Sequence, residues 1–254
     1  MSVPTWVTAF LDLEATAWER GTSFWAQVTG SELSALRGED CEFGTLLPAD
    51  GDAHVKVQRR ADGHTRLHLD LHVPDPTAAA DTAVGLGARE VHRSRHGYVV
   101  LDSRAGLPFC FVSHPAATRT RPVTWPTGHR SLLDQVCLDV GPGAFDGEVA
   151  FWAALTGWEP TTSSSTGEFV PLARPAGQPW RFLLQRTHDE RAAGAHLDLG
   201  TDDRTAEVER HVALGARVEA QHGHWTVLRD PVGTPYCITD RDPETGMLGP
   251  VTSP

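Results

Sequence analysis

Two four-residue segments carry the residue types in this sequence that are best suited to chemistry. His68-Leu69-Asp70-Leu71 returns later as His196-Leu197-Asp198-Leu199. Alternate residues of a strand point to the same face, so each histidine shares a face with the aspartate two positions later. An imidazole beside a carboxylate can form a buried hydrogen-bonded pair, or it can supply nitrogen and oxygen ligands to a divalent metal. The residue types leave both interpretations open.

These segments belong to a longer repeat, whose other members keep the same order and spacing. Phe24 to Gly30 returns as Phe151 to Gly157, Leu86 to Arg89 as Leu214 to Arg217, and Pro108 to Phe111 as Pro235 to Ile238, with offsets of 127 or 128 residues. A repeat of about 110 residues has the size of a domain. We therefore expect a first domain over residues 1–113, a linker over 114–130, a second domain over 131–240 and a polar tail over 241–254.

The elements that position these segments follow one order in each copy, and they predict an α+β fold. Alternation predicts strands over Trp6 to Leu13 and Leu133 to Val140, each followed by a helix that ends near Gly30 or Gly157. Asp75 and Asp203 are suited to cap a second helix in each copy. Further short strands complete two βαβββ units a copy.

Composition limits the classes of partner. The formal net charge is -11 and no run of Lys or Arg occurs, which argues against nucleic acid and anionic membranes as partners. No apolar stretch approaches the roughly 20 residues that span a bilayer, and Met1 to Phe10 has no secretory pattern. Four cysteines without close pairs fit a reducing compartment. We expect a cytoplasmic protein, either a monomer or, alternatively, a dimer.

The motifs resemble those of the vicinal oxygen chelate superfamily, and within it the tandem glyoxalase-like domains of actinobacterial type, related to glyoxalases and bleomycin resistance proteins. The resemblance is carried by Phe24-Trp25 with Thr29-Gly30, Arg66 to Leu71, Gly106 to Cys110 and, in the second copy, Asp230 to Cys237. It covers almost the whole chain apart from the linker and tail, and it implies that the two βαβββ units of each copy form a curved mixed sheet around a cleft. The superfamily includes lyases, isomerases, ring-cleaving dioxygenases and non-catalytic drug-binding proteins, so the resemblance implies a fold without selecting a reaction.

The resemblance also implies where a metal would bind. Members of this superfamily usually hold a divalent ion with residues from the first and last strand of each unit. The matching positions are Thr8, Gln58, His68 and Cys110 in the first copy, and Gln135, Gln185, His196 and Cys237 in the second. Both copies lack a carboxylate where glutamate is typical. Asp70 and Asp198 share a strand face with the histidines and could reach the cleft or orient the imidazoles.

Three hypotheses follow for the function. The first is a binding protein that holds a small, partly apolar molecule in its clefts without a resident metal. The second is a lyase, isomerase or dioxygenase that uses Zn, Ni, Mn or Fe in the second domain. Its ligands would be Gln135, Gln185 and His196, with Cys237 or Asp198 completing the set. The third is a drug-sequestering protein, for which Trp180, Trp225 and Tyr98 would form an aromatic wall. In a plainer interpretation Cys110 and Cys237 are apolar core residues, and His211 is expected on an exposed helix face.

Overall fold

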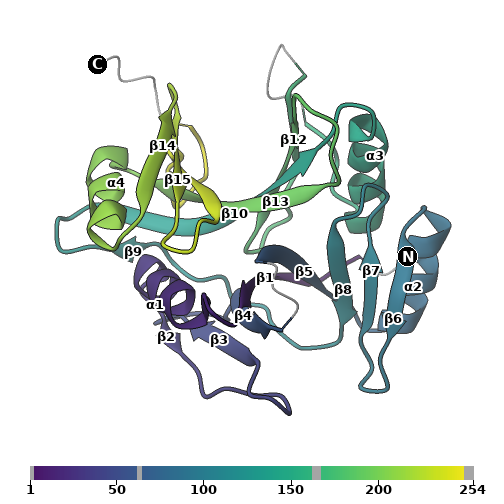
Figure 1. The fold of residues 1–254 in the computed structure, drawn as a ribbon. Coiled ribbons are helices and arrows are strands. Elements are labelled where there is room, and N and C mark those ends of the chain that lie inside the picture. Colours follow the sequence, from purple (N-terminus) through teal and green to yellow (C-terminus); the bar gives the residue numbers. More distant parts are fainter. Residues whose placement is uncertain (1–2, 62–64, 162–166, 249–254) are drawn as a thin grey trace.

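The structure is a computed structural model that describes residues 3–61, 65–161 and 167–248. These residues form two mixed sheets of eight strands and four helices, and Figure 1 shows both sheets as curved and open. The predicted α+β class is confirmed. Residues 249–254 of the predicted tail lie outside the described residues. Within the described part of the chain, no helix is long and apolar enough to cross a membrane.

Each sheet is built from two units joined at their first strands, and three of the four units have the order βαβββ among the described residues. The first sheet runs in the order β2 (Glu32–Leu33), β3 (Phe43–Leu47), β4 (Val55–Arg60), β1 (Trp6–Glu14), β5 (Arg66–His72), β8 (Pro108–Val112), β7 (Val99–Asp102), β6 (Arg89–Arg93). Strand β1 pairs parallel to β4 and antiparallel to β5. The two-residue strand β2 is an addition that the sequence pattern did not predict.

The second sheet repeats this order from β3 to β6, and among the described residues it has no counterpart of β2. It runs β11 (Phe169–Leu172), β12 (Arg181–Arg186), β10 (Arg130–Val140), β13 (Gly194–Thr201), β16 (Pro235–Thr239), β15 (Trp225–Arg229), β14 (Arg217–Gln221), and the short β9 (Val123–Thr124) pairs with β10. Strand β10 pairs parallel to β12 and antiparallel to β13, as β1 does in the first sheet. The duplication predicted from the sequence is therefore present in the strand pairing.

The helices begin and end where local chemistry predicts. They are α1 (Trp18–Thr29), α2 (Pro76–Gly85), α3 (Phe145–Thr156) and α4 (Arg204–Ala213). The Asp75 carboxylate accepts a hydrogen bond from the Ala78 amide at 3.0 Å, and Asp203 accepts one from Ala206 at the same distance. Gly30 ends α1 with a φ of 62°, in the left-handed region that glycine adopts without strain.

The first helix of each copy packs against the other copy's sheet. In α1, Trp25 contacts the ring of Tyr236 in β16, with 5.2 Å between the ring centroids, and its indole N–H donates to Asp230 at 3.0 Å. In α3, Trp152 contacts Phe109 in β8, at 5.4 Å between centroids. Figure 1 accordingly shows α1 beside α4. Buried residues of both copies form one continuous hydrophobic core, so the two domains are firmly joined.

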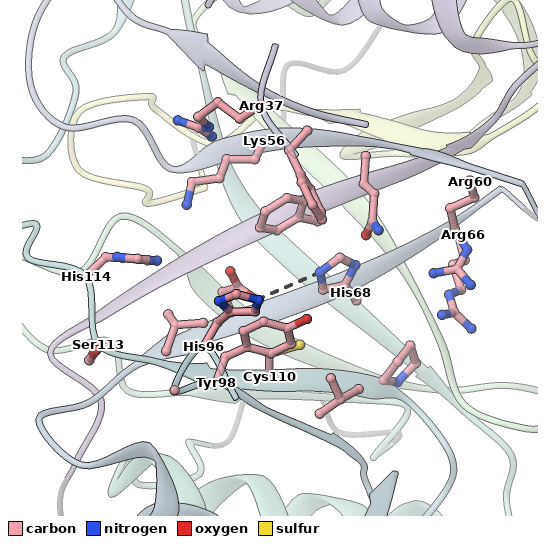
Figure 2. Close-up of a pocket in the computed structure, with 18 residues that line it drawn as sticks. Arg37, Lys56, Arg60, Arg66, His68, His96, Tyr98, Cys110, Ser113 and His114 are labelled. Carbon is pink, nitrogen blue, oxygen red and sulfur yellow. Dashed lines mark ion pairs between the residues drawn. The ribbon is translucent and has the colours of Figure 1, made fainter. Parts of the chain in front are cut away.

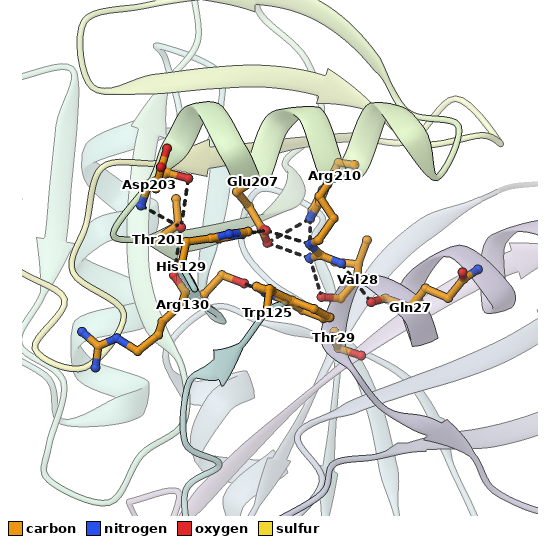
Figure 3. A network of polar contacts seen from close by, with 12 residues as sticks. Gln27, Val28, Thr29, Trp125, His129, Arg130, Thr201, Asp203, Glu207 and Arg210 are labelled. Carbon is orange, nitrogen blue, oxygen red and sulfur yellow. Dashed lines mark hydrogen bonds and ion pairs between the residues drawn. The ribbon is translucent and has the colours of Figure 1, made fainter. Parts of the chain in front are cut away.

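A buried polar network strengthens this junction (Figure 3). The Glu207 carboxylate of α4 accepts hydrogen bonds from Arg210 at 2.7 and 2.8 Å, and it bonds His129 at 2.6 Å and His211 at 3.1 Å. Arg210 also donates to the Gln27 and Val28 carbonyl oxygens at the end of α1. The prediction that His211 is exposed is wrong, because its ring is fully buried and is held by Glu207 and Tyr236.

Two other predicted features are buried rather than open to a cleft or to solvent. Trp180 is fully buried, and its indole N–H donates to the His54 carbonyl oxygen at 3.2 Å, so its predicted place on a cleft wall is wrong. The first part of the predicted tail is packed rather than loose. Arg241 is buried there, and its guanidinium lies 2.8 Å from an Asp134 carboxylate oxygen.

Candidate functional site

Each copy contains one histidine between two aspartates on the polar face of its sheet. The His68 Nδ1 atom lies 2.8 Å from Asp12 Oδ1, with the distance but not the alignment of a hydrogen bond, and its Nε2 lies 3.8 Å from Asp70. In the second copy, His196 Nδ1 hydrogen-bonds Asp139 at 2.9 Å, and Nε2 lies 3.4 Å from Asp198. An aspartate at Nδ1 fixes the imidazole orientation and directs Nε2 toward the second carboxylate.

Asp12 and Asp139 are the members of these groups that sequence reasoning missed. The sequence does contain a pattern that indicates Asp12. Thr8, Phe10 and Asp12 alternate along β1 and therefore share one face. Register pairs Phe10 with His68 and Asp12 with Arg66, two pairs further along β1, so Asp12 is the next residue of β1 on the face of His68. A search for pairs within one strand finds Asp70, whereas Asp12 is brought to His68 only by pairing between strands.

The first domain contains a cavity of about 560 Å³ over this face. Of the predicted site residues, Gln58, His68, Asp70 and Cys110 line it. Phe10 lies flat against the His68 ring, with 4.5 Å between centroids, and forms part of the wall. The other wall residues are Arg37, Phe43, Lys56, Arg60, Arg66, His96, Gly97, Tyr98, Val100, Pro108, Val112, Ser113 and His114, and Figure 2 shows how they are placed.

Thr8, the remaining predicted residue of the first copy, makes its contacts within the sheet. It is fully buried, and its hydroxyl group is within 2.9 Å of His72 Nε2. The His72 Nδ1 atom bonds the His114 carbonyl oxygen at 2.8 Å. Thr8 is therefore engaged in a structural hydrogen bond between β1 and β5, and it is not among the cavity-lining residues.

The second copy brings its predicted residues together in a more enclosed arrangement. Gln135 donates to Asp198 Oδ2, and Gln185 accepts a weak bond from the Cys137 thiol at 3.7 Å. His196 and Asp198 belong to a group with Cys237 whose potential ligand atoms all lie within 4.8 Å of one another. The structure thus places Asp198 beside His196 and Cys237, while both amides are hydrogen-bonded to their neighbours.

The two copies differ at the aromatic residues above the site. Phe43 and Tyr98 both line the first cavity. Strand register places Phe169 and Trp225 at the equivalent positions of the second copy. Those two rings touch edge to face, with 6.0 Å between centroids. Residues from the two halves of the second sheet therefore meet across its polar face.

The cysteines of both sites are protonated thiols near neutral pH. Burial raises the pKa of Cys237 to about 11 and that of Cys137 to about 12, and nearby Asp198 adds to both effects. Burial, with Asp70 beside it, also raises the pKa of Cys110 well above its usual range. Metal binding through a thiolate would therefore have to release a proton.

The donor atoms of each site can be compared with those that divalent metals prefer. His68, Asp70 and Cys110 form one group with ligand atoms within 4.8 Å, and the second copy has the corresponding group. The Asp198 Oδ1 atom is buried without a hydrogen bond among the described residues, and it forms an ion-pair contact with His196 Nε2 at 3.4 Å. An unsatisfied buried carboxylate oxygen is costly unless a cation or proton meets it. Nitrogen, oxygen and sulfur donors together suit zinc or a similar divalent ion, so the second copy's residues fit such an ion.

Fold and site together define a tandem protein of paired βαβββ units with a polar, histidine-bearing face in each copy. The family model described as "Glyoxalase-like domain" matches residues 8–112 and again residues 135–239. The chain therefore belongs to the glyoxalase-like domain family and contains two copies of the domain. None of the curated proteins compared with the sequence matches it.

Solved structures share the fold at low sequence identity. A Mn(II)-bound glyoxalase from Novosphingobium aromaticivorans is 18% identical with a TM-score of 0.65, and the match covers 94% of this chain and 83% of the other. A mutant 4-hydroxymandelate synthase from Streptomyces coelicolor is 17% identical with a TM-score of 0.63, covering 98% and 95%. A catechol 2,3-dioxygenase is 14% identical with a TM-score of 0.63, covering 100% and 92%. At these identities the likeness establishes the fold alone.

Proposed function

We propose that the protein binds a small, partly apolar molecule in the cavity of the first domain. The observation that carries this proposal is the open space of about 560 Å³ directly over His68, Asp70 and Gln58. Pockets for small ligands commonly have volumes of about 300–1,000 Å³ and combine apolar walls with a few polar groups. This cavity has that size and that mixture.

The lining supports recognition of a ring or a similarly flat apolar group. Phe10, Phe43 and Tyr98 contribute aromatic faces or edges, and Val100 and Val112 contribute aliphatic surface. Aromatic walls attract apolar ligands by burial and by ring contacts. His68 and Gln58 would supply hydrogen bonds to polar atoms of the same molecule.

The aromatic contact in the second copy favours the first domain as the binding domain. Phe169 and Trp225 occupy with their own rings the region that a ligand would enter, whereas Phe43 and Tyr98 border open space. We infer that the second domain mainly completes the shared core and supports the first. It contributes α3, whose Trp152 packs beneath the first sheet at Phe109.

A pair of equivalent substitutions tests this proposal. Val100 lines the first cavity and is paired with Cys110, and Val227 is paired with Cys237 in the second copy. A set of small aromatic compounds is screened by thermal shift, and the hits are measured by isothermal titration. We expect Val100→Phe to abolish binding and Val227→Phe to preserve it. Hits that bind Val100→Phe as tightly as the wild type would contradict the proposal.

The same experiment separates an enzyme from a sequestering protein. Each hit is incubated with the protein, with and without added divalent metal, and is then recovered and analysed by mass spectrometry. Recovery of the unmodified compound supports a binding protein of the sequestering type. Conversion that is lost in Val100→Phe supports a lyase, isomerase or dioxygenase that acts in the first domain.

A second candidate function is metal-dependent catalysis in the second domain. It is favoured by the buried Asp198 Oδ1 atom, which makes no hydrogen bond among the described residues and lies 3.4 Å from His196 Nε2. His196, Asp198 and Cys237 would hold the ion. A divalent metal in such a site acts as a Lewis acid toward substrate oxygens or bound water. Metal content after dialysis against Zn²⁺ or Mn²⁺ tests this candidate. We expect Asp198→Asn to lower bound metal and Asp70→Asn to leave the second site loaded; equal metal content in Asp198→Asn and the wild type would exclude it.

A further inference from the structure

One cation in the first cavity differs in type from all the others in the chain. Of the 22 lysine and arginine residues, 21 are arginine, and Lys56 is the only lysine. It lies on β4, where register pairs it with Phe10 of β1, and it lines the cavity. A lysine ammonium is a compact charge with three donors on a flexible stem, whereas arginine presents a broad planar fork.

The surroundings of Lys56 leave its charge without a close partner. Its ammonium nitrogen lies 5.4 Å from the centroid of the Phe10 ring. Neither a hydrogen bond nor an ion pair joins it to another of the described residues. Burial lowers the pKa of Lys56, while Asp70 opposes this effect and Arg37 adds to it. The ammonium group is therefore partly desolvated and is available to a ligand.

The other cationic side chains of the cavity divide into two groups, as Figure 2 shows. Arg60 and Arg66 lie beyond His68 and approach the Asp12 carboxylate to 3.7 and 3.2 Å. Arg37 lies near Lys56, and its guanidinium donates to the neutral Thr45 hydroxyl at 2.9 Å. Asp70 is the one carboxylate among the cavity-lining residues.

The Arg37 and Lys56 end of the cavity is therefore positively charged, although the whole protein carries a formal charge of -11. In a partly enclosed site of lower dielectric, such a local charge attracts anions more strongly than it would in water. An ammonium group and a guanidinium group form short charge-assisted hydrogen bonds to carboxylates and similar anions.

We propose that the molecule bound in the first domain is a small organic anion with an aromatic or otherwise apolar body, and that Lys56 binds its charged group. This inference rests on the proposed function of the cavity. Arg37 stands beside Lys56 as a second cation, and Phe10, Phe43 and Tyr98 contact the apolar body. The second copy has Leu183 at the position equivalent to Lys56, so charge selection belongs to the first domain alone.

The single lysine allows a direct test in the full chain. Reductive methylation with ¹³C-formaldehyde labels Lys56 and the N-terminal amine, which serves as an internal reference. The protein is titrated with 3-phenylpropionate and with its neutral amide, 3-phenylpropanamide. We expect the carboxylate to shift the Lys56 methyl resonance and raise the pKa of that group, and the amide to leave the pKa unchanged.

The affinities of two variants for the carboxylate and for the amide complete the test. Lys56→Leu introduces the residue that the second copy has at this position, so we expect it to fold. It should weaken binding of the carboxylate by about tenfold or more, the loss of one good ion pair, and change binding of the amide by less than about threefold. Arg217→Gln removes one exposed positive charge from β14 and should leave both affinities unchanged.

Failure of this inference is distinguishable from failure of the proposed function. If both compounds bind equally to the wild type and to Lys56→Leu, while Val100→Phe abolishes both, the cavity binds ligands but does not select anions. If inorganic phosphate binds as tightly as 3-phenylpropionate, the apolar body is not recognised and the inference is overturned. If neither compound binds or moves the Lys56 resonance, and the aromatic screen gives no hit that depends on Val100, both proposals fail.

Discussion

Replacement of Glu207 by alanine should strongly destabilise the junction between the two domains. Glu207 is fully buried, and its carboxylate bonds Arg210, His129 and His211. Burial alone would raise the pKa of Glu207, but the hydrogen bonds from Arg210 and His211 outweigh this effect and lower the pKa well below its usual range. The carboxylate is therefore charged, and its removal leaves the Arg210 charge without its partner.

The expected magnitude follows from burial. Removing one member of a buried ion pair costs about 3–5 kcal/mol, because the remaining charge stays desolvated. For a chain of this size, each kcal/mol lowers the melting temperature by about 2–4 °C, which gives a decrease of roughly 6–20 °C. The Arg210 contacts to the end of α1 should loosen as well, since the carboxylate orients the guanidinium.

Urea unfolding monitored by circular dichroism and by tryptophan fluorescence measures this loss. Glu219→Ala is the matched control, because Glu219 pairs with Arg229 at 2.9 Å on the surface, where both side chains are more than two-fifths exposed. An exposed pair contributes at most about 1 kcal/mol. If Glu207→Ala loses no more stability than Glu219→Ala, the buried network does not hold the domains together.

Two further predictions concern stability. Burial lowers the pKa of three histidines, which are His54, His72 and His211. The unfolded chain therefore takes up protons first, and the free energy of unfolding should fall as pH drops below about 6.5, by at most about 1.4 kcal/mol per pH unit for each group. Burial lowers the pKa of His196, but the hydrogen bond with Asp139 and its other neighbours raise it well above the usual range, so the contribution of His196 is already complete below about pH 6.5 and leaves this slope unchanged. Urea titrations between pH 7 and 5 measure the slope, and a rise in stability would contradict this reasoning. Gly200→Ala should cost about 1–3 kcal/mol, because the new Cβ would lie 2.9 Å from a backbone oxygen; Gly194→Ala on the same strand meets no atom within 4 Å and should be nearly neutral, so equal effects in thermal melts would be inconsistent with this packing.

Much of the fold can be predicted from the sequence because its signals are local or repeated. The alternation of Leu67, Leu69 and Leu71 predicts a half-buried strand, and Asp75 predicts a helix start; both are confirmed. The exchange of helices between copies is not predictable in this way. Helical spacing shows that Phe24 and Trp25 are buried, but it does not show which sheet buries them.

The sites were only partly predictable for the same reason. Family positions led to His68 and His196, and the structure places both on the polar faces of their sheets. Asp12 is brought to His68 by strand register, which depends on the pairing of β1 with β5. The difference between the copies depends on whether two aromatic rings meet across the sheet, and sequence spacing carries no information on that contact.

A structure of the protein co-crystallised with 3-phenylpropionate tests the central claim most directly. The account predicts electron density for one ligand in the first domain, with its carboxylate at Lys56 and its ring among Phe10, Phe43 and Tyr98. Ligand density in the second domain alone, or a first cavity that remains without ligand at saturating concentration, would contradict the account.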